Sequence, residues 1–215
     1  MRGELIFLVD DDDAVRTSLH ALLETAGYRT AQFESGIDFL ESPDVGLGAC
    51  VLLDVKMPGP DGLEVQRRLN ERGETLPVVI LTGHGDIAMA VQAMRAGAVD
   101  FLEKPVSRKQ LLESVGRAID VDRRDRRDQH ERSEIGTRLR ELSPRERQVL
   151  ERLVLGRTNK LVARELGISS RTIEVYRRNV MMKMGADSLS HLVRMTLVAG
   201  IDPVGGDTLS TGGST

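Results

Sequence analysis

The first half of the chain repeats one hydrophobic pattern. Short runs rich in leucine, isoleucine and valine lie at residues 5–9, 50–55, 77–82 and 99–103. Their apolar residues are nearly continuous and do not alternate with polar ones, which is typical of strands buried on both faces of a sheet. A fifth and more polar strand is predicted at residues 28–33.

Helical patterns separate these runs. One apolar stripe begins at Val15 and ends before Gly27, and further stripes cover residues 61–72 and 86–96. A last helix is predicted to start near Ser107. Because strands alternate with helices, we expect the α/β class, as a doubly wound, five-stranded parallel sheet of the flavodoxin-like kind with helices on both faces.

The apolar stripe of the last helix fades after Val121 into a run of mixed charges. Opposite charges recur there four residues apart, a spacing that stabilises helices. The pairs are Asp120 with Arg124, Asp122 with Arg126, Arg124 with Asp128, and Arg127 with Glu131. We predict that a first domain covers residues 1–121 and that residues 122–138 form a solvated helical linker. The alternative is that the basic cluster of this segment contacts nucleic acid.

The remaining pattern predicts a small all-α domain at residues 139–200. Ser143, Pro144 and Glu146 form the start signal of a helix, because the serine and the glutamate satisfy free backbone amides and proline suits the first turn. Several short helical patterns follow. Residues 201–215 are rich in glycine, serine and threonine and are predicted to form a disordered tail.

Composition and charge agree with two domains. A chain of 215 residues is long for a single core. Residues 1–106 carry 18 acidic and 9 basic side chains, a net charge of −9, whereas residues 137–215 carry 8 and 13, a net charge of +5. The acidic half suits a cation and the basic half a polyanion. Without a secretory signal or an apolar stretch of about 20 residues, the chain is expected to be cytoplasmic and not to enter the membrane.

Polar side chains gather where the predicted strands end. Asp10 and Asp11 end the first strand and Asp54 the third, while Thr82 and Lys104 come at the ends of the last two. Ligands bind at this edge of an open parallel sheet. Three neighbouring carboxylates repel unless a hard cation such as Mg²⁺ lies among them. A hydroxyl and an ammonium beside that cation suit a phosphoryl group, for which an aspartate can be the acceptor.

The four consecutive aspartates at residues 10–13 divide between two tasks. Asp10 and Asp11 are the pair that a metal needs. Asp12 and Asp13 are predicted to cap the following helix, where the helix dipole favours negative charge. The alternative is that the whole run is a solvated acidic loop.

The basic half contains the spacing of a helix-turn-helix. Gly167 comes four residues after Ala163, and Ile173 six residues later. A small residue lets two helices approach, glycine permits the sharp turn, and a branched apolar residue fixes the second helix. Ser169 or Ser170 is expected to cap that helix. The alternative is a helical bundle with a charged surface.

The second helix of this motif has two faces, because successive residues lie about 100° apart. The face predicted to pack contains Ile173, Tyr176, Val180 and Met184. The opposite face contains Arg171, Glu174, Val175, Arg178 and Met182. In a major groove, Glu174 can accept a hydrogen bond from cytosine, Arg178 can donate to guanine, and Val175 can touch a thymine methyl group.

Phosphate contacts are expected from the edges of the same motif. The residues placed there are Asn159, Lys160, Thr172 and Arg177. Ser169 and Ser170, at the start of the second helix, complete the predicted DNA-binding surface.

Motifs of the first half resemble the receiver domain of bacterial two-component response regulators. They read VDDDD, LLDVKMPGPDG, ILTGHGD and GAVDFLEKP, in this order, and the resemblance covers roughly residues 3–120. It implies that a partner histidine kinase phosphorylates Asp54. It also implies that Thr82 and Lys104 contact the phosphoryl oxygens.

The same resemblance extends to the metal and to a conformational switch. It implies that the carboxylates of Asp10, Asp11 and Asp54 hold Mg²⁺ together with the backbone carbonyl of Lys56. Phe101 matches the aromatic switch position of the family. The peptide bond between Lys104 and Pro105 is expected to be cis, a form that proline permits.

Residues 139–199 resemble the LuxR-type DNA-binding domain, through the motifs LSPRERQVL, NKLVARELGISSRTIEVYRRNVMMKM and SLSHLVRM. The whole chain therefore resembles the NarL/FixJ family of response regulators, nearest to its FixJ branch. This implies a phosphorylation-controlled transcription regulator, not an enzyme, with promoter DNA and RNA polymerase as partners. Many relatives have a basic residue where this chain has Glu174, so their base preference does not transfer.

Binding to a two-fold symmetric DNA site requires a dimer. We expect phosphorylation of Asp54 to draw Thr82 inward, to let Phe101 follow, and to reshape residues 86–105 into the face of a homodimer, with activation of transcription favoured over repression. One alternative is a Mg²⁺-dependent phosphohydrolase with an aspartyl-phosphate intermediate. Another is a DNA-binding protein whose receiver is no longer phosphorylated.

Overall fold

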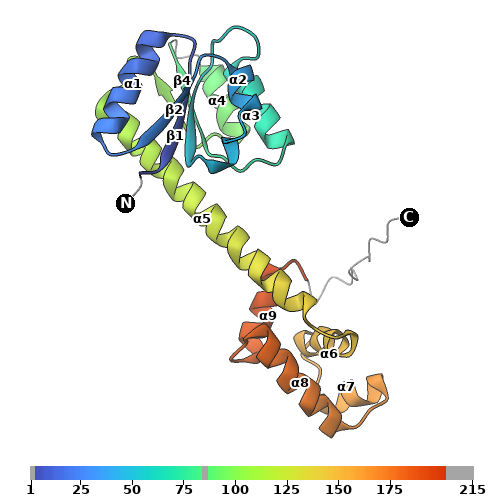
Figure 1. The fold of residues 1–215 in the computed structure, drawn as a ribbon. Helices are drawn as coiled ribbons and strands as arrows, with labels where there is room; N and C mark the ends of the chain where they lie inside the picture. Colours follow the sequence, from blue (N-terminus) through green and yellow to red (C-terminus); the bar gives the residue numbers. More distant parts are fainter. Residues whose placement is uncertain (1–2, 84–86, 202–215) are drawn as a thin grey trace. The chain divides into compact units, whose positions relative to one another are not determined.

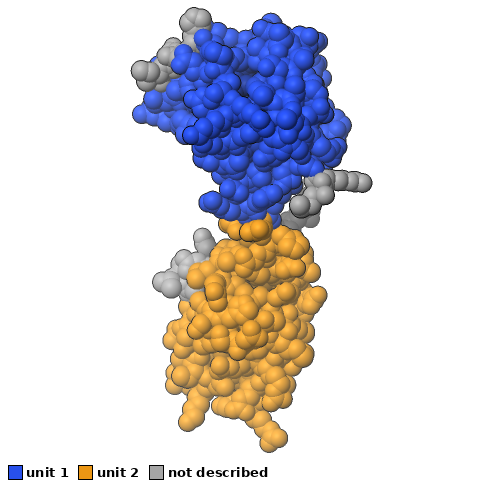
Figure 2. Space-filling view, turned by 90° about the vertical axis from the view of Figure 1, so that its left-hand side faces the viewer, with its two compact units in different colours: residues 1–126 blue, residues 127–215 orange. Residues whose placement is uncertain are grey.

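The structure, a computed structural model, describes residues 3–83 and 87–201 and divides into two compact units, residues 1–126 and 127–215 (Figures 1 and 2). The predicted disordered tail, apart from Ile201, lies outside the described residues. So does Asp86, the first residue of the predicted dimer face.

The first unit is built on a five-stranded parallel sheet in the order β2-β1-β3-β4-β5. The strands are β1 (Leu5–Val9), β2 (Arg29–Phe33), β3 (Cys50–Asp54), β4 (Val78–Thr82) and β5 (Asp100–Glu103). Both the predicted strands and the α/β class are confirmed. Since all strands run the same way, their carboxyl ends meet at one edge, where Asp54 of β3 pairs with Leu81 of β4.

Helices cover both faces of this sheet (Figure 1). They are α1 (Asp13–Thr25), α2 (Gly36–Glu41), α3 (Gly62–Glu71), α4 (Ile87–Arg95) and α5 (Arg108–Arg140), with a short 3₁₀ helix η1 (Val45–Leu47) before β3. Side chains of β1 alternate between two cores. Phe7 and Val9 pack in the core below α2, α3 and α4, whereas Ile6 and Leu8 pack in the core below α1 and α5. Burial on both faces explains why the sequence pattern of β1 is apolar throughout.

Helix α5 runs through the predicted linker without a break. Of the four predicted ion pairs, only Asp122 with Arg126 lies within bonding distance, at 2.8 Å. Arg126 also donates to the main-chain carbonyl oxygen of Gly48 at 2.8 Å, and Arg123 pairs with Glu4 at 2.6 Å. These contacts attach residues 122–126 of α5, which lie beyond the predicted domain boundary, to residues that come just before β1 and β3.

The second unit packs the end of α5 with four helices in the described part of the chain. They are α6 (Pro144–Val154), α7 (Asn159–Leu166), α8 (Ser170–Met184) and α9 (Leu189–Val198). The predicted capping box is present, since the Ser143 side chain accepts from the Glu146 amide and the Glu146 side chain accepts from the Ser143 amide. Ile135 of α5 is buried in this core, although it lies within the predicted linker.

Candidate functional sites: an acidic pocket and a helix-turn-helix

Three carboxylates meet at the carboxyl edge of the sheet. Asp10 follows β1 and Asp54 ends β3, and their residues are only 1% and 4% exposed. Asp11 is exposed beside them. Oxygens of Asp10, Asp11 and Asp54 lie within 4.8 Å of one another, close enough to share one metal ion. An all-carboxylate donor set of this kind fits the oxygen preference of Mg²⁺.

Lys104 joins two of these carboxylates. Its Nζ donates to Oδ2 of Asp10 at 2.5 Å and to Oδ1 of Asp54 at 2.6 Å. Its backbone amide donates to the carbonyl oxygen of Thr82 at 2.7 Å, and the peptide bond that follows, to Pro105, is cis as expected. The ammonium therefore offsets the repulsion that would otherwise separate two buried carboxylates.

Burial and the neighbouring Lys104 have opposite effects on the pKa of Asp54. Burial raises the pKa of its carboxyl above the ordinary value, and the hydrogen bond from Lys104 lowers it only in part. For Lys104, burial works toward a lower pKa, but the bonds to Asp10 and Asp54 outweigh burial and raise the pKa. The second oxygen of Asp54 accepts from the Lys56 amide at 2.8 Å. The backbone of Gly62 lies against that of Asp54. A Cβ added at Gly62 would lie 2.3 Å from the Asp54 carbonyl oxygen, so only glycine fits at this position.

The remaining aspartates of the run lie at the start of α1. Asp12 is the N-cap, and its side chain accepts from the amides of Ala14 and Val15 at 2.9 and 3.2 Å. Asp13 is the first helical residue and pairs with Arg16 at 2.9 Å. Of the two residues predicted to cap α1, Asp12 does so, whereas Asp13 makes no capping bond and places its charge in the first turn. Asp10 and Asp11 lie together with Asp54, as the predicted metal pair requires. Arg16 is a residue that the sequence analysis missed.

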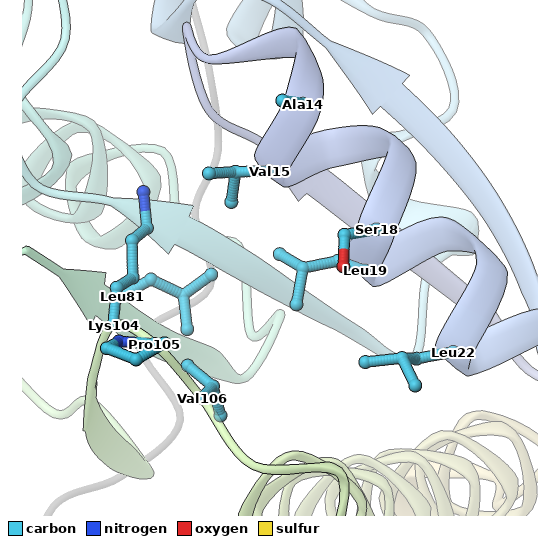
Figure 3. A pocket seen from close by; sticks show the side chains of 9 residues that line it. All are labelled: Ala14, Val15, Ser18, Leu19, Leu22, Leu81, Lys104, Pro105 and Val106. Atoms are coloured by element: carbon cyan, nitrogen blue, oxygen red, sulfur yellow. The ribbon is translucent and has the colours of Figure 1, made fainter.

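The predicted switch residues occupy neighbouring strands. Thr82 ends β4 and is 1% exposed, and Phe101 lies on β5, partly buried against the core below α4. Within the described part of α4, Val91 and Met94 are 45% and 48% exposed. An apolar cavity of about 500 Å³ lies on the face of the sheet that α1 covers. There Leu19 and Leu22 of α1 face Pro105 and Val106 (Figure 3).

The helix-turn-helix of the second unit consists of α7 and α8. Gly167 ends α7 in the left-handed conformation, with φ of 67°, which favours glycine. Of the two serines considered, Ser169 is the N-cap of α8 and accepts from the Thr172 amide at 3.1 Å. Ser170 is the first helical residue. The predicted turn is therefore present at the predicted place.

The two faces of α8 divide as predicted. Ile173, Val180 and Met184 are fully buried, and Tyr176 is partly buried. All members of the opposite face are exposed, namely Arg171, Glu174, Val175, Arg178 and Met182. Among the edge residues, Arg177 donates to the side chain of Asn159 at 3.3 Å and so connects α8 to the start of α7. Lys160 is exposed, and Thr172 is partly buried.

The far end of α8 is held by contacts that the sequence did not indicate. Arg138 of α5 donates to the carbonyl oxygen of Met184 at 3.0 Å. Lys183 pairs at 2.7 Å with Glu146, whose side chain is 5% exposed. The bond from Lys183 lowers the pKa of the Glu146 carboxyl. These contacts fix the helix whose exposed face is available to DNA.

Two family models match the chain in the regions that contain these sites. Residues 6–116 match the response regulator receiver domain, and residues 140–196 match the bacterial regulatory proteins of the luxR family. Within the described residues, no helix combines the length and the apolar character needed to cross a bilayer.

Curated relatives share this organisation over nearly their whole length. The transcriptional regulatory protein FixJ of Azorhizobium caulinodans is 48% identical over 198 residues, which cover 92% of this chain and 94% of the relative. The response regulator protein TodT of Pseudomonas putida is 41% identical over 195 residues, which cover 91% and 86%.

Solved structures give the same result. The response regulator StyR superposes with a TM-score of 0.80 at 36% identity, covering 91% of this chain and 98% of that one. Full-length FixJ from B. japonicum matches with a TM-score of 0.58 at 46% identity, covering 94% and 100%. The chain therefore belongs to the response regulators that join a receiver domain to a LuxR-type helix-turn-helix domain. It is a two-component response regulator of the FixJ and TodT type that binds DNA, and the alternative of a phosphohydrolase is set aside.

Proposed function

We propose that Asp54 accepts a phosphoryl group from a partner histidine kinase and that this event controls promoter binding. The observation that carries the proposal is the position of Asp54, whose carboxylate contacts Nζ of Lys104 and has an oxygen within 4.8 Å of carboxylate oxygens of Asp10 and Asp11. A carboxylate oxygen of Asp54 attacks phosphorus, the P–N bond of the phosphohistidine breaks, and the imidazole leaves. No other reactant is needed.

The ligands for Mg²⁺ are Asp10, Asp11 and Asp54, with the backbone carbonyl of Lys56. When bound, Mg²⁺ offsets negative charge on the carboxylates and on the incoming phosphoryl oxygens. Lys104 would supply a second positive charge from its place beside Asp54, and the hydroxyl of Thr82 would donate a hydrogen bond to a phosphoryl oxygen. Together these groups would balance the charge of the phosphoryl group, which is about −1.5 to −2.

Phosphorylation is proposed to change the population of two receiver conformations. Moving such a switch from about 1:99 to 99:1 needs roughly 5.5 kcal/mol, whereas one hydrogen bond to a charged group contributes only about 1.5–3 kcal/mol. Thr82 alone is therefore insufficient, and Lys104, the metal ion and dimer contacts must contribute. Thr82 and Phe101 lie on the paired strands β4 and β5, which supports a shared movement.

The active form is proposed to be a homodimer that recruits RNA polymerase and activates transcription in the cytoplasm. Val91 and Met94 support a dimer face at residues 86–105, because both are large apolar side chains that are nearly half exposed. In the second unit, the exposed face of α8 enters a major groove. There Glu174, Val175 and Arg178 contact base edges, while residues at the edges of the motif contact phosphates.

The proposed chemistry is tested by treating the full chain with Mg²⁺ and acetyl phosphate and measuring its intact mass. We expect the gain of one phosphoryl group, and no gain in Asp54→Asn. The same samples in sedimentation experiments should show dimers only where the mass has increased. An unchanged mass of the wild-type chain would overturn the proposal. Labelling that persists in Asp54→Asn would show that the acceptor is another residue.

A further inference from the structure

The residue next to the metal ligands that the sequence analysis missed is Arg16. Its side chain is only 11% exposed, although arginine is a residue of the surface. One guanidinium nitrogen, Nη1, donates to the main-chain carbonyl oxygen of Asp10 at 2.6 Å. The other, Nη2, donates to the carboxylate of Asp13 at 2.9 Å. One planar fork therefore joins both ends of the aspartate run.

With this bond, every polar atom of Asp10 has a partner. Its amide donates to the carbonyl oxygen of Phe33 at 3.2 Å, and its carbonyl accepts from Arg16. One carboxylate oxygen accepts from the amide of Asp12 at 3.0 Å, and the other accepts from Lys104 at 2.5 Å. Asp10 is thus fixed in orientation, and Arg16 is the side chain that fixes its backbone.

The place of Arg16 in α1 argues for such a role. It lies in the first turns of the helix, four residues after the N-cap Asp12. Positive charge is unfavourable at that end of a helix dipole. The i,i+3 ion pair with Asp13 stabilises the helix only weakly, because Asp13 is 86% exposed. The bond to the main-chain carbonyl oxygen of Asp10 is made outside the helix and has no role in forming it.

We infer that Arg16 is a positioning residue for the magnesium site. It does not touch the metal ion, but it holds the backbone from which Asp10 and Asp11 project. Residues that orient metal ligands commonly change metal affinity about 10-fold to 100-fold when replaced. The inference rests on the proposed function only through the metal site and not through phosphorylation of Asp54.

Charge and geometry make opposite predictions for this residue. If the guanidinium acted mainly through its charge, its removal would strengthen binding of a cation. If it acts by holding the Asp10 carbonyl, its removal weakens binding. Lysine keeps the charge but lacks the planar fork that donates to Asp10 and Asp13 at once, so Arg16→Lys separates the two effects.

The test is isothermal calorimetry of Mg²⁺ binding to the full chain and its variants, with thermal unfolding measured on the same samples. Asp13→Asn is the matched control, because it removes the charge of the exposed partner of Arg16 and leaves the Asp10 contact. We expect Arg16→Gln to weaken Mg²⁺ binding about 10-fold, Arg16→Lys to weaken it less, and Asp13→Asn to leave it nearly unchanged.

Unchanged or tighter binding in Arg16→Gln overturns the inference, and so does an equal loss in Asp13→Asn. If Arg16→Gln does not fold, Arg16→Lys decides, and wild-type affinity in that variant overturns the inference. Labelling by acetyl phosphate in Arg16→Lys should return to the wild-type rate at saturating Mg²⁺. A wild-type chain that binds Mg²⁺ without being labelled contradicts the proposed function and not the role of Arg16, whereas a chain that binds no Mg²⁺ contradicts both.

Discussion

Nζ of Lys104 lies 2.6 Å from Oδ1 of Asp54, although 50 residues separate them in the chain. The contact exists because β3 and β5 end at the same edge of the parallel sheet, with only β4 between them. The same ammonium also contacts Asp10. The ammonium of Lys104 therefore connects the ends of three strands.

Replacing Lys104 should destabilise the receiver in a way that magnesium reverses. Lys104→Gln leaves two buried carboxylates without their counter-ion, which we expect to cost about 1–3 kcal/mol. Added Mg²⁺ should therefore raise the melting temperature of the variant more than that of the wild-type chain. Lys109→Gln is the matched control, because Lys109 is 85% exposed and contacts Glu113 only at 4.0 Å. Equal stabilisation of all three proteins by Mg²⁺ would contradict this prediction.

Acid should loosen the DNA-binding unit through Glu146. Because Lys183 lowers its pKa in the folded state, the carboxyl binds fewer protons when folded than when unfolded. Its contribution to stability is therefore complete above its ordinary pKa of 4.5 and is lost as the pH falls through the lower folded value. The protection factors of α6 and α8 amides, which correct hydrogen exchange for its intrinsic pH dependence, should fall over this range in the wild-type chain. In Glu146→Gln the same amides should show a smaller pH dependence, and an identical pH dependence would exclude this role.

Truncation of Ile135 should destabilise the second unit and not the first. The side chain is 3% exposed and lies in the core with Leu150 and Val180. We expect Ile135→Ala to cost about 2–4 kcal/mol there. His130→Ala, five residues earlier on the exposed part of α5, should change stability by less than about 0.5 kcal/mol. The readout is hydrogen exchange resolved by helix, and faster exchange in the sheet of the first unit would disagree with this assignment.

Two exposed cations of the helix-turn-helix should affect DNA binding differently. Arg178→Ala is expected to cost about 1–3 kcal/mol on the preferred site and to relax the preference at one base pair. Lys160→Ala should weaken binding to all sequences alike. It should also reduce the slope of log affinity against log salt concentration by about one. Affinities for a library of sites at several salt concentrations measure both effects. An equal loss of affinity for all sequences in both variants would contradict the base contact proposed for Arg178.

The strands and the pocket were predictable because both follow from local features. Buried parallel strands leave continuous apolar runs, and strands that are parallel must end at one edge, so Asp10, Asp54 and Lys104 could be brought together from spacing alone. The faces of α8 were predictable for the same reason, because a helical period assigns Ile173 and Glu174 to different sides.

Other contacts were beyond the sequence pattern. Arg16 and Arg138 both donate to main-chain carbonyls, which every residue possesses, so no residue type signals the partner. Ile135 is buried by tertiary packing after an exposed stretch, and no apolar stripe leads to it. Of the charge pairs predicted along α5, only Asp122 with Arg126 forms, because exposed ion pairs gain too little to hold flexible side chains in place.

Phosphorylation of one buried carboxylate, that of Asp54, is proposed to control DNA binding. Its most direct test is the affinity of the full chain for its promoter fragment, measured as a function of the fraction of molecules that carry a phosphoryl group by intact mass. We predict that affinity rises with that fraction, more steeply than in proportion because each dimer needs two phosphorylated chains, and that Asp54→Asn, treated in the same way, stays at the level of the untreated protein. Complete phosphorylation with no gain in affinity would contradict the account.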